Sequence, residues 1–131
     1  MSKKMSTETN AINWFEIAAS DINRATTFYE TIFEIKTVPM EMMGMKMAIF
    51  PYDDTKGAIG GAIVQSQMHK PGAGGVTIYL NANPDLGLVE KRIEKAGGKI
   101  IMSKMLIDEN TGYMALFIDS EGNTIGIHST N

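Results

Sequence analysis

The sequence lacks cysteine altogether, and among its 131 residues it has only two histidines and one tryptophan. The absence of cysteine excludes disulfides, thiolate zinc sites, Cys-ligated iron–sulfur clusters and Cys nucleophiles. With only His69 and His128, a three-His metal site within a single chain is excluded as well. A divalent metal ion would therefore need carboxylate, amide or water ligands.

Long apolar runs and an excess of basic residues are also missing. The net charge is −3 and the pI is about 5.3, which argues against a nucleic-acid partner because phosphate binding needs clustered Lys and Arg. The apolar runs fall far short of the ~20 residues that cross a bilayer, and none follows Lys3-Lys4 as in a signal peptide. We expect a cytoplasmic protein with no membrane or nucleic-acid partner.

The elements that are present occur in the same order twice. The first half predicts a strand at 13–19, a helix at 22–33 that Ser20 or Asp21 caps, and strands at 36–40, 45–51 and 60–65. The second half predicts a strand at 76–81, a helix that begins after Asn83-Pro84-Asp85 and ends at Gly97-Gly98, and strands at 99–107, 113–118 and 123–129.

These repeats predict an α+β fold of two tandem βαβββ modules. We expect a frayed tail at 1–10, a first module at 11–68, a Gly/Pro linker at 69–75 and a second module at 76–131. Each half is too small to bury enough apolar surface alone, so the halves should pair. Curled sheets would then leave a concave cavity for a small-molecule ligand.

Three separated motifs carry a family resemblance. Residues 14–17 (Trp-Phe-Glu-Ile), followed by Asp-Ile at 21–22, Arg-Ala at 24–25 and Phe-Tyr at 28–29, resemble the opening of the vicinal oxygen chelate superfamily. That superfamily includes glyoxalase I, bleomycin-resistance proteins and extradiol dioxygenases. Residues 117–126 resemble its closing Asp-x-x-Gly-Asn hairpin, and the Ala-Gly-Gly at 96–98 also fits. The resemblance covers about residues 11–129 and implies a glyoxalase-like fold and a homodimer.

The same resemblance locates the usual metal ligands. The positions that normally hold His, Gln or Glu carry Trp14, Thr77 (or Ile78, if the register differs by one) and Gly126 here. These side chains are poor ligands, so the resemblance indicates a member without a metal cofactor. A fourth ligand near Gln65 or Gln67 stays open.

Glu16 and His128 are the candidate catalytic residues. Glu16 lies two residues after Trp14 and shares its face of the first strand, where burial would suit the carboxylate to general-base catalysis. His128 shares the face of Gly126 and could serve as its acid–base partner. The alternative for each is a structural hydrogen bond. His69 is expected to be solvated beside Lys70.

The Met-rich segment 40–47 has two interpretations. Its methionines could line an adaptable apolar pocket, although core packing or an oligomer contact is favoured. Thioethers can also bind Cu(I), but no Cys or His stands nearby in the sequence.

Two main hypotheses for the function follow. The first is a metal-free protein that binds an apolar or aromatic ligand, similar to drug-sequestering resistance proteins. The expected ligand-binding residues are Trp14, Phe50, Thr77, Tyr79, Met45 and Met47. The second is a glyoxalase I-like lyase or isomerase that needs a divalent metal ion. A third, weaker hypothesis is metal-free acid–base catalysis by Glu16.

Overall fold

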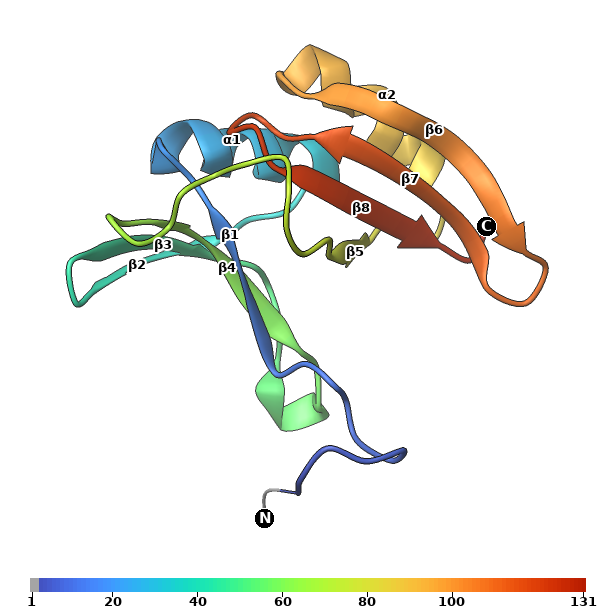
Figure 1. The fold of residues 1–131 in the computed structure, drawn as a ribbon, viewed down its shortest axis with the longest axis horizontal. Coiled ribbons are helices and arrows are strands. Elements are labelled where there is room, and N and C mark those ends of the chain that lie inside the picture. The colour runs from blue at the N-terminus through green and yellow to red at the C-terminus, as the bar shows by residue number, and fades with distance from the viewer. Residues whose placement is uncertain (1–2) are drawn as a thin grey trace.

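The computed structural model of the protein describes residues 3–131 and contains two modules of the same design (Figure 1). The first consists of β1 (Trp14–Ala18), α1 (Ile22–Phe33), β2 (Val38–Met42), β3 (Met45–Ile49), the short 3-10 helix η1 (Asp54–Lys56) and β4 (Gly60–Gln65). The second consists of β5 (Tyr79–Asn81), α2 (Leu86–Ala96), β6 (Lys99–Asp108), β7 (Gly112–Ile118) and β8 (Thr124–Ser129). The predicted tandem βαβββ fold is confirmed.

Both sheets have the same topology. Their strand orders are β1-β4-β3-β2 and β5-β8-β7-β6, with β1 parallel to β4 and β5 parallel to β8. Each helix packs on one face of its own sheet, and the two helices contact each other where the modules meet (Figure 1). The sheets themselves diverge on either side of the helix pair and do not close into a barrel.

Each helix begins in the same way. An aspartate caps its N-terminus, Asp21 in α1 and Asp85 in α2. The first helical N–H then donates to a side chain at the end of the central strand, from Ile22 to Gln65 Oε1 and from Leu86 to Ser129 Oγ, both at 2.8 Å. These equivalent bonds indicate that the two modules correspond where each helix meets its sheet.

Some predicted boundaries differ from the structure. The strand expected at 76–81 forms pairs only over β5, and Val76 is 90% exposed because no strand lies beside it after Gly74-Gly75. The strand expected at 36–40 is displaced to β2, where its register opposite β3 places the hairpin turn at Met43-Gly44, both with positive φ. Of the predicted tail, residues 1 and 2 lie outside the described residues, and 3–13 contain no helix or strand.

One hydrophobic core fills the space between the helices and both sheets. Its largest side chains without exposed surface include Tyr29, Phe117, Ile63 and Ile127, so both modules contribute. Because the core is continuous, neither half has to bury its own apolar surface alone. No helix among residues 3–131 is long and apolar enough to cross a membrane.

The hairpin between β7 and β8 connects the second module to the first. Buried Asp119 accepts a hydrogen bond of 2.7 Å from the Tyr29 hydroxyl, and Asn123 donates to the Ala18 carbonyl. Burial, and then the charge of Asp119, raises the pKa of Tyr29 well above its usual value. The hairpin motif of the sequence therefore serves as the polar connection across the module junction.

Glu121 of the same hairpin binds the start of α1. Its Oε1 accepts from the backbone N–H groups of Ser20 and Asp21, and its carboxylate pairs with Arg24 at 2.7 Å. Burial alone would raise the pKa of Glu121, but the bonds from Arg24 and from the backbone outweigh it and lower the pKa.

Candidate functional site

Each sheet has one face that its helix does not cover, called here the open face. In β1, Phe15 and Ile17 point to the helix side, so Trp14, Glu16 and Ala18 lie on the open face. The same alternation defines both surfaces. The open face of the first sheet consists of Trp14, Glu16, Ala18, Val38, Met40, Met42, Met45, Met47, Ile49, Gly60, Ala62 and Val64. That of the second sheet includes Tyr79, Asn81, Met102, Met105, Met114, Leu116, Ile118, Thr124, Gly126 and His128.

Glu16 lies between two ring nitrogens on the open face of the first sheet. Its Oε1 lies 2.7 Å from His69 Nε2, and its Oε2 accepts from Trp14 Nε1 at 3.2 Å. On the other side of the imidazole, Nδ1 lies 2.7 Å from Ser66 Oγ. With a proton on Nε2 the ring donates to the carboxylate, and Nδ1 shares a hydrogen bond with the hydroxyl. The result is a fixed carboxylate–imidazole–hydroxyl chain.

The prediction that His69 is solvated was therefore wrong. Its side chain is only 20% exposed, because the turn at 66–69 brings the ring back over β1. Sequence distance concealed this contact, since 53 residues separate His69 from Glu16. His128, the partner predicted for Glu16, lies on the second sheet and bonds through Nε2 to the Thr111 carbonyl at 2.7 Å. The structure thus brings Glu16 to His69 and shows no contact between Glu16 and His128.

A pair of aromatic rings lies next to this carboxylate. The Tyr52 ring packs edge-on against Trp14 with centroids 5.8 Å apart, and it also covers Gly60, where a Cβ would overlap it. The sequence pattern did not indicate Tyr52, which lies in the loop before η1. The feature that indicates an aromatic ring at this place is Gly60, which lies opposite Trp14 on the neighbouring strand, because a glycine leaves room for a ring.

Phe50 does not lie on the open face, contrary to the expectation that it lines the same cavity as Trp14. It points to the helix side, where its ring stacks on Phe15 at 5.6 Å and meets Tyr29 edge-on at 5.7 Å. Alternation along β3 explains the error: Met45, Met47 and Ile49 take the open face, and the strand ends before Phe50.

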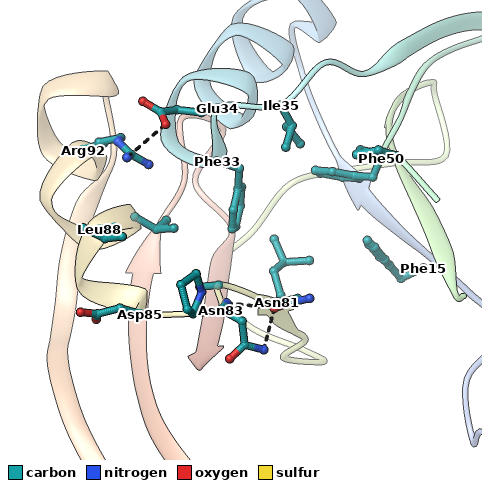
Figure 2. A pocket seen from close by; sticks show the side chains of 15 residues that line it. Phe15, Phe33, Glu34, Ile35, Phe50, Asn81, Asn83, Asp85, Leu88 and Arg92 are labelled. Carbon is teal, nitrogen blue, oxygen red and sulfur yellow. Dashed lines mark hydrogen bonds and ion pairs between the residues drawn. The ribbon is translucent and has the colours of Figure 1, made fainter. Parts of the chain in front are cut away.

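Phe50 instead lines a cleft of about 460 Å³ at the module junction (Figure 2). Its walls are mainly apolar, and its polar side chains are already paired. Arg92 bonds to the Ile32 carbonyl at 2.8 Å and to Glu34 at 3.3 Å, and Asn81 accepts from Asn83 at 2.9 Å. The apolar lining comprises Phe15, Phe33, Ile35, Phe50, Leu80 and Leu88.

The residues at the expected metal-ligand positions do not fit a metal site. The parallel strand pairs align the two modules. Ala18 lies opposite Val64 in the first module and Asn81 lies opposite His128 in the second, so these two positions correspond. Four residues earlier, Thr77 therefore corresponds to Trp14. At Gly126 the Tyr79 ring fills the space that a side chain would occupy. An indole, an isolated hydroxyl and a ring-covered glycine supply no strong oxygen or imidazole donor set. Within residues 3–131, no group of three or more His, Asp or Glu side chains could hold a metal ion.

Methionines occupy equivalent places on both open faces. Met47 lies opposite Val64 and Met40, and Met114 lies opposite His128 and Met105. Met47 is buried against Ala62 and Val64, with Trp14 packed beside them, whereas Met40 and Met105 are 43% and 46% exposed. The Met-rich segment therefore lies mainly on an open face and not in the core.

Comparisons with known proteins agree with this architecture. The family model described as the glyoxalase/bleomycin resistance protein/dioxygenase superfamily matches residues 11–127. No curated protein matches the chain.

Solved structures share the fold at low sequence identity. A glyoxalase/bleomycin resistance protein/dioxygenase domain from Frankia is 14% identical with a TM-score of 0.70, over 95% of this chain and 100% of that one. A genomically encoded fosfomycin resistance protein from Listeria monocytogenes is 14% identical with a TM-score of 0.67, over 97% and 94%. Glyoxalase I from Zea mays is 16% identical with a TM-score of 0.63, over 89% of this chain but 43% of the maize enzyme.

Proposed function

This chain belongs to the glyoxalase/bleomycin resistance protein/dioxygenase superfamily, and we propose that within it the protein binds a small apolar or aromatic molecule without a metal cofactor. The ligand would lie on the open face of the first sheet, against Trp14, Tyr52 and the methionines. The observation that carries the proposal is the fixed Glu16 carboxylate between aromatic rings on an otherwise apolar surface. Ligand sites combine apolar walls with a few fixed polar groups in this way.

The amount of exposed apolar surface supports the same location. On the first open face, Val38, Met40 and Met42 are 58%, 43% and 45% exposed. A contiguous apolar patch on a soluble domain marks an interaction surface, and methionine adapts its shape to the molecule that it contacts.

A second copy of the chain would complete this site. The open face of the second sheet is exposed too, through Tyr79, Met102 and Met105. Small modules gain stability when such surfaces are buried in a symmetric dimer. We therefore expect a homodimer in which open faces are covered and the bound ligand is enclosed.

A lyase reaction of the glyoxalase I type is the less favoured function. It needs a Lewis acid to stabilise an enediolate oxygen, and Trp14, Thr77 and Gly126 do not form a donor set for one. The relationship to maize glyoxalase I, at 16% identity, extends to the fold alone.

Metal-free acid–base catalysis is the second candidate, and one contact favours it. Glu16 and His69, 2.7 Å apart, have the geometry of a base and its proton-sharing partner, and Ser66 orients the far side of the imidazole. In this candidate mechanism, His69 takes the place that the sequence had suggested for His128 as the partner of Glu16.

The test of the binding function uses Trp14, which is the only tryptophan and reports from the site itself. Aromatic compounds are titrated against the purified protein and intrinsic fluorescence is recorded, before and after chelator treatment and with added Ni²⁺, Zn²⁺, Mn²⁺ or Fe²⁺. We expect saturable quenching that neither treatment changes. Stoichiometric tight metal that is required for binding would overturn the metal-free proposal.

Two matched variants locate the ligand. Met45→Ser alters the open face and Leu88→Ser alters the junction cleft, and both side chains are partly exposed. We expect Met45→Ser to weaken binding by about tenfold, or 1.4 kcal/mol, while Leu88→Ser leaves it unchanged. The reverse result would indicate that the ligand binds in the junction cleft. For the catalytic candidate, any detected activity must be lost in Glu16→Gln, and an unchanged rate would eliminate it.

A further inference from the structure

The hairpin of β2 and β3 places four methionines directly opposite one another in pairs. Met40 pairs with Met47, and Met42 pairs with Met45. Because the partners alternate with Glu41 and Lys46 along their strands, all four side chains leave the same face of the hairpin. Sequence spacing alone does not show this, since it depends on the register of the hairpin.

The geometry of such pairs lets the sulfur atoms meet. Side chains directly opposite on an antiparallel ladder have Cβ atoms about 5 Å apart, and diagonal neighbours are about 7–8 Å apart. Methionine has three rotatable bonds and a polarizable thioether, so three or four sulfurs can converge over the middle of this block. Met47 forms the buried floor, and Met40 and Met42 are accessible from solvent.

Apolar side chains lie beside the block. The one charged pair of the hairpin, Glu41 opposite Lys46, projects to the other face. Ala62 and Val64 are buried in one cluster with Met47, and Trp14 packs against this cluster. Hard cations such as Mg²⁺ and Ca²⁺ gain nothing from such a surface, because they require oxygen ligands.

We infer that the methionines 40, 42, 45 and 47 form a binding site for a soft monovalent cation, Cu(I) or its analogue Ag(I). Thioether sulfur is a ligand that selects Cu(I) over hard divalent metals. This site uses none of the positions at which the superfamily resemblance would locate a metal ion. This site overlaps the surface proposed for the small-molecule ligand, but Ag(I) binding is measured without that ligand, so the outcomes of the two tests are distinguishable.

The experiment titrates the full-length protein with Ag(I), which needs no reductant, and measures stoichiometry and affinity by calorimetry. Protein labelled with ¹³C at the methionine methyl groups is titrated in parallel and followed by NMR. We expect one Ag(I) per chain and shifts confined to the methyl groups of the four methionines. Zn²⁺ at the same concentration should produce neither effect. No Ag(I) binding, equal binding of Zn²⁺, or shifts at other methionines would overturn the inference.

Leucine substitutions complete the test, because leucine conserves volume but removes the sulfur. Replacing all four methionines should lower the Ag(I) affinity at least a hundredfold, and Met42→Leu alone should lower it several-fold. Controls are Met43→Leu, in the turn of the same hairpin, and Met68→Leu, both almost fully exposed. Met42→Leu keeps the test decisive if the fourfold variant fails to fold. Equal loss in the controls would contradict the site.

Discussion

The module junction and the open faces differ in how completely their side chains are buried and hydrogen-bonded. At the junction, Asp119 accepts four hydrogen bonds, from Tyr29, Glu121 and Asn123, and the surrounding core is buried. On the open faces, large apolar side chains such as Met42 and Met105 remain close to half exposed. The same strands supply both surfaces through alternate residues.

This difference separates the residues that fix the fold from those that are free to act. A buried polar network tolerates no missing partner, because each orphaned group keeps its full desolvation cost. An exposed apolar face costs the monomer little when it is changed, but it determines what the monomer binds. Substitutions at the junction should therefore affect stability, and substitutions on the open faces should affect association.

The largest effect is expected for Asp119→Ala. The change leaves the Tyr29 hydroxyl and two backbone N–H groups without their acceptor inside the protein, so the free energy of unfolding should fall by about 3 kcal/mol. The matched control is Asp108→Ala, since Asp108 makes the same kind of turn bonds to Asn110 and Thr111 but is exposed. Its loss should stay below about 1 kcal/mol in urea unfolding. Equal losses of unfolding free energy in the two variants would contradict the special role of the junction hydrogen bonds.

Glu121→Gln should give a smaller effect that depends on pH. The pKa of Glu121 is lowered in the folded protein, so its carboxylate stabilises the fold above the pKa of the unfolded chain, and this contribution is lost as the pH falls through the folded pKa. At pH 7 the variant should be less stable by about 1–2 kcal/mol, because Arg24 loses its charged partner. The gap to wild type should close as the pH falls below the usual range of a glutamate.

The control for this pH profile is Glu34→Gln. Glu34 pairs with Arg92 at 3.3 Å, but its side chain is 70% exposed, so the pair should contribute little. A gap between wild type and Glu121→Gln that is independent of pH would contradict the role of the carboxylate charge.

The sequence predicted the fold more fully than the site, and particular residues show why. Helix periodicity and capping residues are local, so α1 was predicted with its observed bounds. The contacts of Glu121 with Ser20 and of His69 with Glu16 join segments 101 and 53 residues apart, and no local pattern encodes them. The facing methionine pairs depend on the hairpin register, and the sequence predicted the first strand of the hairpin two residues too early, at 36–40.

Gly126→Ala tests the boundary between the two kinds of surface. A Cβ at this position would overlap the Tyr79 ring, which is 49% exposed and can swing outward. We expect a loss of about 1 kcal/mol in the wild-type background and almost none in a Tyr79→Ala background. Equal losses in both backgrounds would show that the ring does not fill this space.

The smallest effect on stability should come from Met105→Ser, which alters the open face of the second sheet. Because Met105 is 46% exposed, the free energy of unfolding measured at low protein concentration should change by less than about 0.5 kcal/mol. Self-association measured by sedimentation should weaken by several-fold if this face meets a second copy. Met68→Ser, in an exposed turn outside both open faces, should change neither quantity. A Met105→Ser protein that loses stability but associates normally would show that the open face serves the fold itself, and the contrast with the junction would then fail.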